Sequence, residues 1–562
     1  MKSDVTIVLG GQAGQGIQTI EFILARVLKR SGYHVFSTKE YMSRIRGGLN
    51  TITLRAADRP VSALTRHIDI LLPLDPGIAE HVADRMTGDT VILGDAGTPS
   101  LDRVVLDAPI SSIAREAGGK LYESTAAVGV LAGILEADQT ILRDYLKVYF
   151  KGKKPEVIDH NCSAADLGYE AGRKLCEDGS LSFSISRDEK TAERILINGA
   201  EAVAMGAIAG GCNFISSYPM SPSTGVLTFL ASHDETFNIV AEQAEDEIAA
   251  VNMAVAAWYA GARAMATTSG GGLALMGEGI SLAGVLETPL VIHLAQRPGP
   301  GTGLPTRTEQ GDLELALYAG HGEFPRVIYA PGTIEEAFFL CARAFNTADR
   351  YQVPVFILTD QYTMDTYYDI PEFELDAISV EKHIVETKAG YQRYRITEDG
   401  VSPRGVPGYG SGLVAADSDE HDEDGHITES MAVRTAQVDK RLGKMGLIMK
   451  DPVPPVLTGP ADFTLLLVGW GSTCQPIREG LERSGRTDAA HLHFPQVYPL
   501  PLQAQSYLEQ AQKVVVVENN ATSQFGKLLT LYGGREPDGA ILKYDGQPFT
   551  VEELAEAIIE ID

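Results

Sequence analysis

The sequence has few cysteines, and they lie far apart. Its 562 residues contain 5 Cys, the closest pair is 14 positions apart, and no C-x-x-C pair occurs. Iron–sulfur clusters and structural zinc sites are normally held by more tightly grouped cysteines. We therefore expect no metal site on this chain and interpret all five cysteines as thiols without metal: Cys162, Cys176, Cys212, Cys341 and Cys474.

The sequence is also poor in positive charge and in long hydrophobic runs. It has 47 Lys and Arg against 75 Asp and Glu, a formal net charge of −28. Nucleic acids and anionic membranes bind clustered basic residues, so neither is an expected partner. No apolar run reaches transmembrane length, and the first residues enter a strand without a signal-peptide pattern. These features favour a cytoplasmic location.

What the sequence contains is an alternation of buried strands and amphipathic helices, too long for one core. Such alternation is typical of an α/β fold with mostly parallel sheets covered by helices. We predict three α/β domains, at 1–185, 193–375 and 458–562, with a connecting excursion rich in Gly, Pro and acids at 376–457.

Within that excursion, DSDEHDEDGH at 417–426 looks like a calcium-binding loop. Counted from Glu420, it has Met431 at the position where a bidentate glutamate is needed, so we favour a solvated acidic loop. The excursion as a whole is either ordered or a mobile loop.

The segment GGQAGQG at 10–16 follows a predicted strand and precedes a helix. Its spacing, G-x-x-G-x-G, differs from the dinucleotide-binding fingerprint, so a phosphate-bearing ligand and a purely structural turn both remain open. Nearby, SRIRGG at 43–48 places two arginines beside two glycines, a grouping that suits phosphate. The candidate ligand contacts are Gly11, Gly14, Gly16, Ser43, Arg44 and Arg46.

In the second domain, four predicted strands end in polar loops, and in a parallel sheet such loops meet at one edge, where ligands bind. We expect Ser221, Glu247, Ser269–Gly272 and Arg297 to converge there. Glu247 opens a helix with almost no other charge, so its carboxyl should be buried and suited to proton transfer. Hydroxyls and an arginine suit a carboxylate, and the glycines admit a planar cofactor. The sequence therefore predicts a site for a small carboxylate with one acid/base group.

Several of these segments together resemble one family. YPMSPST at 218–224 resembles the Y-P-I-T-P motif of the 2-oxoacid:ferredoxin oxidoreductases, which use thiamine diphosphate. Residues 247–272 are similar to that family's pyrimidine-binding segment, and 296–313 to its next loop. VLGGQAGQGI with SRIRGGLNTITLR resembles its gamma domain, and LLLVGWGST with VVVVENN resembles its transketolase-C-like domain. The order, gamma ahead of alpha, is that of the 2-oxoglutarate branch.

The resemblance implies roles for individual residues. Glu247 matches the glutamate that hydrogen-bonds the aminopyrimidine of thiamine diphosphate and promotes loss of the thiazolium proton. Arg297 matches the arginine that holds the substrate carboxylate, Ser221 replaces the family's threonine, and Arg307 is the candidate for a distal carboxylate. The remaining implied contacts to thiamine diphosphate are Tyr218, Pro219, Ser269, Gly270 and Gly271, and the Gly-rich loop with SRIRGG would contact coenzyme A.

Two absences then suggest a partner. No G-D-G triplet is present to hold the diphosphate and Mg²⁺, and no cysteine cluster is present for a [4Fe–4S] cluster. The resemblance implies that a beta subunit supplies both, in an (alpha–beta)₂ heterotetramer that reduces ferredoxin. The expected reaction is oxidative decarboxylation of 2-oxoglutarate to succinyl-CoA, and its reverse, reductive carboxylation, is a step of the reductive tricarboxylic acid cycle.

Three alternatives stay open from the sequence. Pyruvate or a branched-chain 2-oxoacid is the alternative substrate within the family. A thiamine-independent transferase that binds coenzyme A or a nucleotide would explain the Gly-rich loop alone. A non-catalytic scaffold for a redox partner is the third.

Overall fold

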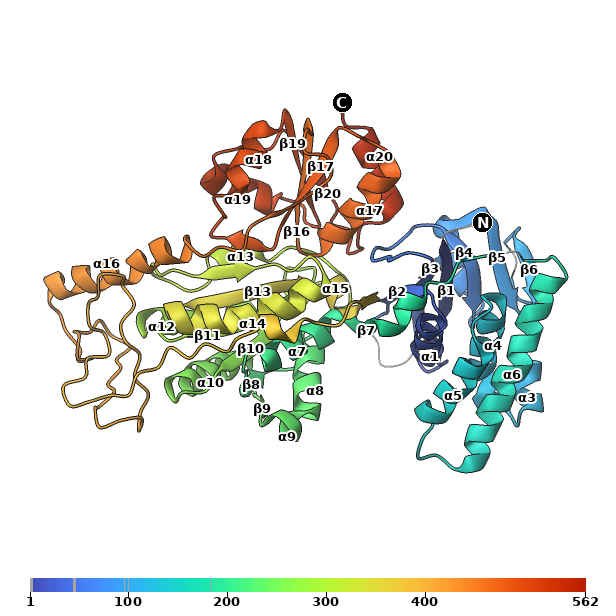
Figure 1. The fold of residues 1–562 in the computed structure, drawn as a ribbon, viewed down its shortest axis with the longest axis horizontal. Helices are drawn as coiled ribbons and strands as arrows, with labels where there is room; N and C mark the ends of the chain where they lie inside the picture. Colours follow the sequence, from blue (N-terminus) through green and yellow to red (C-terminus); the bar gives the residue numbers. More distant parts are fainter. Residues whose placement is uncertain (1–3, 44–46, 96, 100, 182) are drawn as a thin grey trace. The chain divides into compact units, whose positions relative to one another are not determined.

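The computed structural model describes residues 4–43, 47–95, 97–99, 101–181 and 183–562 (Figure 1). The chain divides into two compact units. The first consists of Met1–Asn198, Asp365–Glu372 and Thr550–Glu552, and the second of Gly199–Met364, Phe373–Phe549 and Glu553–Asp562.

One sheet runs through the first unit. Its strands in the described residues are β1 (Asp4–Gln12), β2 (His34–Glu40), β3 (Leu49–Ala57), β4 (Ile68–Pro73), β5 (Met86–Gly94), β6 (Val104–Asp107), β7 (Ile195–Asn198) and β14 (Tyr367–Ile370). They are ordered β6-β5-β4-β1-β3-β2-β14-β7. The half from β6 to β1 is parallel and the half from β1 to β7 is antiparallel, so this sheet is mixed.

The helices of this unit are α1 (Ile17–Arg30), α2 (Ile78–His81), α3 (Ile110–Glu116), α4 (Glu123–Ile134), α5 (Gln139–Tyr149) and α6 (Pro155–Glu177). Helix α4 carries no charge after its first residue and is buried almost all round. It packs closely on α6 because glycines face the crossing. A Cβ added at Gly129 would lie 2.3 Å from the carbonyl oxygen of Ala165. Small residues thus let the two backbones touch.

The main sheet of the second unit is almost entirely parallel. Its strands are β8 (Phe214–Ser217), β9 (Val240–Gln243), β10 (Ala264–Thr268), β11 (Leu290–Gln296), β12 (Val327–Tyr329), β13 (Pro354–Asp360) and β18 (Gln496–Tyr498). Their order in the described chain is β18-β12-β13-β11-β10-β8-β9, and only the edge strand β18 is antiparallel to its neighbour.

The helices around this sheet are α7 (Gly199–Ala209), α8 (Thr224–Ser232), α9 (Asp234–Phe237), α10 (Glu247–Tyr259), α11 (Gly270–Leu275), α12 (Gly277–Val285), α13 (Leu313–Leu317), α14 (Ile334–Tyr351) and α15 (Gln361–Asp365). Helix α10 lies on β8 and β10, and α14 lies on β11 and β13. The start of α10 is fixed by Asp246, whose side chain accepts a hydrogen bond from the backbone N–H of Ala249 at 2.8 Å. This cap places Glu247 at the first helical position, at the end of the sheet where β8 and β10 finish.

The excursion at 376–457 is described along its whole length. It contains helix α16 (Met431–Ile448), which the sequence analysis did not predict. Arg404, deep in the excursion, forms a buried ion pair with Asp349 on α14. In the predicted calcium-like segment, the carboxylate of Glu420 pairs with Arg441 at 2.8 Å. The acidic segment is therefore tied to the chain's own arginines.

A third sheet completes the second unit. It contains β15 (Val456–Thr458), β16 (Leu465–Trp470), β17 (Ala489–Phe494), β19 (Lys513–Glu518) and β20 (Gly539–Leu542), in the order β15-β17-β16-β19-β20. Its helices are α17 (Cys474–Ser484), α18 (Ala504–Gln510), α19 (Gln524–Gly533) and α20 (Val551–Ile559). Reciprocal hydrogen bonds join it to the loop before α13: the backbone N–H of Gln310 donates to the Asn519 carbonyl at 2.7 Å, and the N–H of Asn519 donates to Gln310 Oε1 at 2.9 Å.

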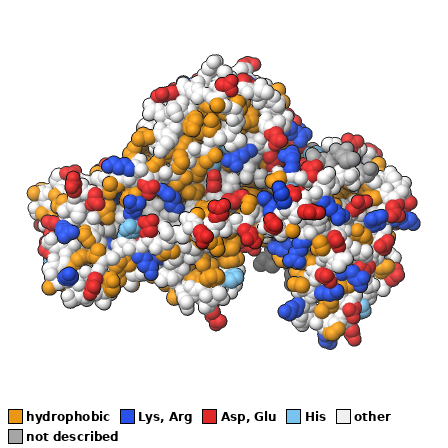
Figure 2. Space-filling model, in the orientation of Figure 1, with side chains coloured by type: hydrophobic (Ala, Val, Ile, Leu, Met, Phe, Trp, Pro, Cys, Tyr) orange, Lys and Arg blue, Asp and Glu red, His pale blue; other side chains and the backbone are white. Residues whose placement is uncertain are grey.

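The three sheets with their helices confirm the predicted α/β class, and the first sheet is mixed rather than mostly parallel. The domain boundaries themselves stay a prediction. Among the described residues, no helix is long and apolar enough to cross a bilayer. On the face drawn in Figure 2, basic side chains lie among the acidic ones, so the negative charge is not gathered in a single patch there.

Candidate active site

The candidate site lies at the carboxyl edge of the main sheet. Strands β8, β9, β10 and β11 are mutually parallel and end at Ser217, Gln243, Thr268 and Gln296. The loops that follow them carry the residues singled out in the sequence. This confirms the prediction that these loops meet at one edge.

Glu247 is the central residue of this edge. Its side chain is 3% exposed, and Oε1 has no hydrogen-bond partner among the described residues. A buried carboxylate oxygen without a donor is costly, so one that persists calls for an explanation. Here the oxygen is available to a donor group of a bound ligand.

Glycines after β10 bring the backbone close to this carboxylate. A Cβ added at Gly272 would lie 2.7 Å from Glu247 Oε1 and 2.0 Å from Thr268 Oγ1. The neighbouring hydroxyl of Ser269 is buried and also lacks a hydrogen-bond partner in the described structure. The turn from β10 into α11 therefore combines a close backbone approach with two unpaired polar atoms.

Asp312 is a second acid at this edge, and the sequence analysis missed it; the residue is half-buried, with its Oδ2 atom fully buried. A Cβ added at Gly270 would lie 2.4 Å from each of its carboxylate oxygens, and Oδ2 has no hydrogen-bond partner among the described residues. Burial, reinforced by Glu309, raises the pKa of Asp312 to about 7. Since Asp312 immediately precedes α13, its sequence position looks like that of an ordinary helix cap, and only the folded loop places it here.

Arg297 connects these groups. Its Nη1 donates to the backbone carbonyl of Ser221 at 2.7 Å. Burial lowers the pKa of Arg297, while the charges of Asp312 and Glu247 oppose that shift. A guanidinium has five N–H donors, so this one bond leaves others for an anionic ligand. The structure thus brings Ser221, Glu247, Ser269–Gly272 and Arg297 together as predicted.

Three other predicted contacts lie nearby or at a neighbouring loop. Tyr218 is 40% exposed just beyond β8, with Pro219 half-buried beside it. Arg307 lies against Gly546 of the third sheet's loop, where an added Cβ would be 3.2 Å from the Arg307 Cβ. A role for Arg307 in substrate binding stays a prediction.

In the first unit, a cavity of about 350 Å³ opens beside the Gly-rich loop. Gly14 and Gly16 line it together with Thr19, Lys39 and Tyr41. Gly16 has a left-handed backbone with φ 83° and immediately precedes α1, whose first N–H groups are therefore available to an anion.

Among the described residues, the other predicted contacts at this loop do not line the cavity. Gly11 lies within β1, and a Cβ there would be 2.8 Å from Gln15 Oε1. Ser43 is exposed, and Arg44 and Arg46 lie outside the described residues.

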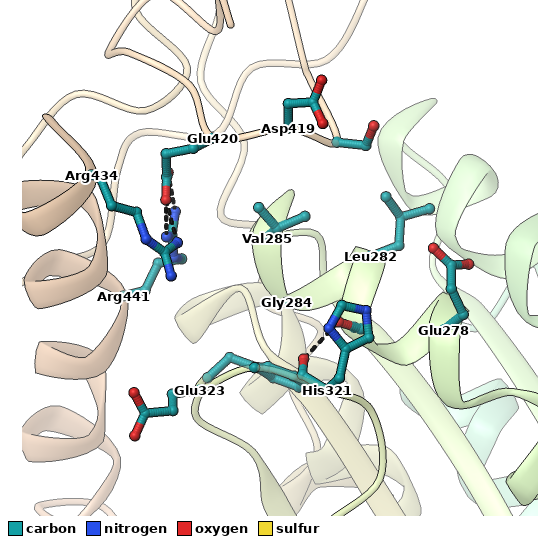
Figure 3. A pocket seen from close by; sticks show the side chains of 14 residues that line it. Glu278, Leu282, Gly284, Val285, His321, Glu323, Asp419, Glu420, Arg434 and Arg441 are labelled. Atoms are coloured by element: carbon teal, nitrogen blue, oxygen red, sulfur yellow. Dashed lines mark hydrogen bonds and ion pairs between the residues drawn. The ribbon is translucent and has the colours of Figure 1, made fainter. Parts of the chain in front are cut away.

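A third region of the chain also holds a cavity of about 350 Å³, between α12, the segment at 321–324 and the excursion. Figure 3 shows Glu420 paired with Arg434 and Arg441 on one side of it, with Glu278 and Leu282 on the other. None of the described candidate site residues lines this cavity. Both arginines that line it share the single carboxylate of Glu420 as their ion-pair partner.

Comparison with known proteins agrees with this geometry. The family model "Pyruvate flavodoxin/ferredoxin oxidoreductase, thiamine diP-bdg" matches residues 205–440, and "Pyruvate ferredoxin/flavodoxin oxidoreductase" matches residues 6–171. The 2-oxoacid:ferredoxin oxidoreductase subunit alpha of a Sulfolobus species is 32% identical over 99% of this chain and 96% of its own length. The chain belongs to the 2-oxoacid:ferredoxin oxidoreductase family. It is accordingly a subunit of an oxidoreductase of this class, of the alpha type.

Two further relatives carry narrower names. The 2-oxoglutarate oxidoreductase subunit KorA of Mycobacterium tuberculosis is 26% identical over 99% of this chain and 91% of its own. A solved structure of 2-oxoglutarate:ferredoxin oxidoreductase from Magnetococcus marinus, with 2-oxoglutarate, coenzyme A and succinyl-CoA bound, has the same fold. Its TM-score is 0.92 at 27% identity, over 100% of both chains. The resemblance inferred from the motifs is thus confirmed for the family and the fold.

Proposed function

We propose that this member of the family acts on 2-oxoglutarate. Together with a beta subunit, it would decarboxylate 2-oxoglutarate oxidatively, transfer the acyl group to coenzyme A to give succinyl-CoA, and pass the electrons to ferredoxin. The observation that carries the catalytic part is the buried carboxylate of Glu247 with its unpartnered Oε1.

The residues around Glu247 fit thiamine diphosphate. Glu247 Oε1 and the Ser269 hydroxyl are both buried without partners, and Gly270 and Gly271 lie next to them in the turn. Tyr218 and Pro219 flank the same edge on the β8 side. Thiamine diphosphate, when bound, supplies the carbon nucleophile and electron sink that side chains lack. The role of Glu247 is to hold a proton at Oε1 or to release it there, in surroundings that exclude water.

The substrate assignment rests on Arg297 and on the relatives. The remaining N–H groups of Arg297 suit a carboxylate in a bidentate arrangement, and Ser221 lies within contact of the guanidinium. Arg307 is the proposed partner of the second carboxylate that 2-oxoglutarate has and pyruvate lacks. The Magnetococcus structure was solved with 2-oxoglutarate bound, which supports this choice. The Sulfolobus relative is named for 2-oxoacids in general, so pyruvate and branched-chain 2-oxoacids are the alternatives.

The partner and the remaining cofactors are proposed from what this chain offers. With five well-separated cysteines and no G-D-G triplet, it supplies neither an iron–sulfur motif nor a diphosphate–Mg²⁺ motif. We assign Mg²⁺ and the [4Fe–4S] cluster to the beta subunit, in an (alpha–beta)₂ heterotetramer. The cavity beside Gly14 and Gly16, at the start of α1, is the proposed contact for coenzyme A.

The test of the catalytic assignment is Glu247→Gln in the reconstituted complex. Turnover should fall by at least about 100-fold, because the amide keeps the shape and loses the proton-accepting oxygen. Glu245→Gln is the matched control, since Glu245 is exposed two positions earlier in the same loop. Full activity of Glu247→Gln in a complex that has assembled would refute the assignment.

The substrate is tested separately by competition between 2-oxoglutarate and pyruvate at equal concentrations on the wild-type complex. A preference for 2-oxoglutarate that is lost in Arg307→Met supports the proposal. A preference for pyruvate in the wild-type complex would overturn the substrate assignment while leaving the role of Glu247 intact.

A further inference from the structure

Cys474, His491 and His493 form a cluster in the third sheet, away from the residues assigned above. Cys474 is the first residue of α17, and the two histidines lie two positions apart on β17, so their side chains project from the same face. One ligating atom from each of the three residues lies within 4.8 Å of the others. All three side chains are 0% exposed.

The imidazole nitrogens of this cluster lack partners. Neither Nδ1 nor Nε2 of His491 has a hydrogen-bond partner in the described structure, and the same holds for Nδ1 of His493. Buried polar groups in folded proteins are nearly always satisfied, so three orphaned nitrogens in one place point to a missing ligand. If these histidines served only for packing, apolar residues in their place would avoid the free-energy cost of burying unpaired ring nitrogens.

Glu336 orients His493 toward the cluster. Its Oε2 lies 2.8 Å from His493 Nε2 and also accepts a hydrogen bond from the backbone N–H of Gly332 at 2.7 Å. In the neutral tautomer whose Nε2–H donates to this carboxylate, the lone pair of His493 lies on Nδ1, one of the orphaned atoms. Histidines that bind metals commonly donate their other N–H to a carboxylate in this way.

We propose that Cys474, His491 and His493 bind a divalent ion of the zinc type, with Glu336 as a positioning residue. One thiolate and two imidazoles suit zinc, and three protein ligands leave the fourth tetrahedral position to water. Zinc–ligand distances of about 2.0–2.3 Å place tetrahedral ligands roughly 3.3–3.8 Å apart, so the cluster needs only a small contraction. The ion would join α17 to β17 and, through Glu336, to α14.

The site departs from the expectation that no cysteine binds metal. Cys474 lies 17 and 19 positions before the two histidines, with no second cysteine nearby, so no short-spacing motif reveals it. The backbone at Gly332 packs directly against two members of the cluster. A Cβ added at Gly332 would lie 2.5 Å from Cys474 Cβ and 2.5 Å from His493 Cε1.

Zinc analysis of the assembled complex tests the proposal. After incubation with Zn²⁺ and removal of free metal, we expect about one zinc per alpha chain, measured by mass spectrometry separately from iron. Cys474→Ser and His491→Ala should lose it, and Cys341→Ser, a buried free cysteine elsewhere, should keep it. Glu336→Gln should weaken zinc binding by about 10- to 100-fold.

A second measurement guards against variants that fail to fold. Wild-type complex loaded with Co²⁺ should show a thiolate-to-cobalt charge-transfer band that is absent from Cys474→Ser. Less than about a tenth of an equivalent of zinc in the wild-type complex, or zinc retained in His491→Ala, would overturn the site. Neither readout depends on the substrate of the enzyme, so failure here leaves the proposed function untouched.

Discussion

Two buried glutamates in the second unit have opposite surroundings. Glu247, at the start of α10, is 3% exposed and has an unpartnered Oε1. Glu287, just after α12, is 1% exposed, and its two carboxylate oxygens lie 2.7 Å from Lys440 Nζ and 2.5 Å from Lys444 Nζ. The two lysines thus surround this buried carboxylate with positive charge.

The difference between them separates two uses of a buried acid. Burial alone would raise the pKa of Glu287, but Lys444, Lys440 and Arg393 hold that pKa at about 2, so the carboxylate is charged at neutral pH and fixes α16 to the sheet domain. Glu247 forms no such ion pair in the described structure, although its charge acts on the neighbouring Arg297. A paired buried charge supports the fold, and an unpaired one is available for chemistry.

Removing the charge of the paired glutamate, Glu287, should have the largest effect on stability. Glu287→Gln leaves two lysines buried without their counter-charge, so we expect the unfolding free energy to fall by about 3–5 kcal/mol. Denaturant unfolding of the chain measures this. Glu278→Gln on α12 is the control, because Glu278 is exposed. A loss below about 1 kcal/mol would show that the ion cluster does not hold the excursion.

Acid should weaken the same cluster. Since the pKa of Glu287 is about 2 in the folded chain and 4.5 ordinarily, its contribution is complete above pH 4.5 and is lost as the pH falls toward 2. The expected loss is up to about 3 kcal/mol, measured as the difference in acid unfolding between wild type and Glu287→Gln. Parallel curves for the two proteins between pH 4.5 and about 2 would contradict the pairing.

Replacing the unpaired acid should not harm the fold. Glu247→Gln removes a buried carboxylate that has no cation of its own, so the unfolding free energy should stay level or rise by up to about 2 kcal/mol. Thermal unfolding of the variant beside wild type tests this. A loss of unfolding free energy larger than about 2 kcal/mol would mean that Glu247 supports the structure. Any loss of activity in Glu247→Gln would then be due to destabilisation of the fold.

The smallest effect is expected at Ser221. The contact to Arg297 uses the Ser221 carbonyl, which every residue has, so Ser221→Ala should retain the arginine's position and lose only the hydroxyl. We expect kcat/KM to drop by about two- to fivefold in Ser221→Ala and to stay nearly unchanged in Ser221→Thr. Steady-state kinetics on the complex decide this, and a drop beyond about 100-fold would assign the hydroxyl a central role.

The sequence could predict the edge that carries the candidate site because local patterns dictate it. A strand, a polar loop and an uncharged helix with one leading acid identify Glu247 without any knowledge of distant contacts. Asp312 and the partners of Glu287 could not be found this way. They depend on which loops meet in space, and helix α16 comes from a stretch whose surroundings look like an irregular linker.

The place of β14 in the first sheet bears on how the chain is made. Strand β14 lies between β2 and β7, so the edge of β2 has no partner until residues 367–370 have been synthesised, about 330 residues after Glu40. At about 5–20 residues per second, that edge waits on the ribosome for roughly 15–65 seconds. An unpaired edge can pair with other chains, so the arrival of β14 closes a site of unwanted strand pairing.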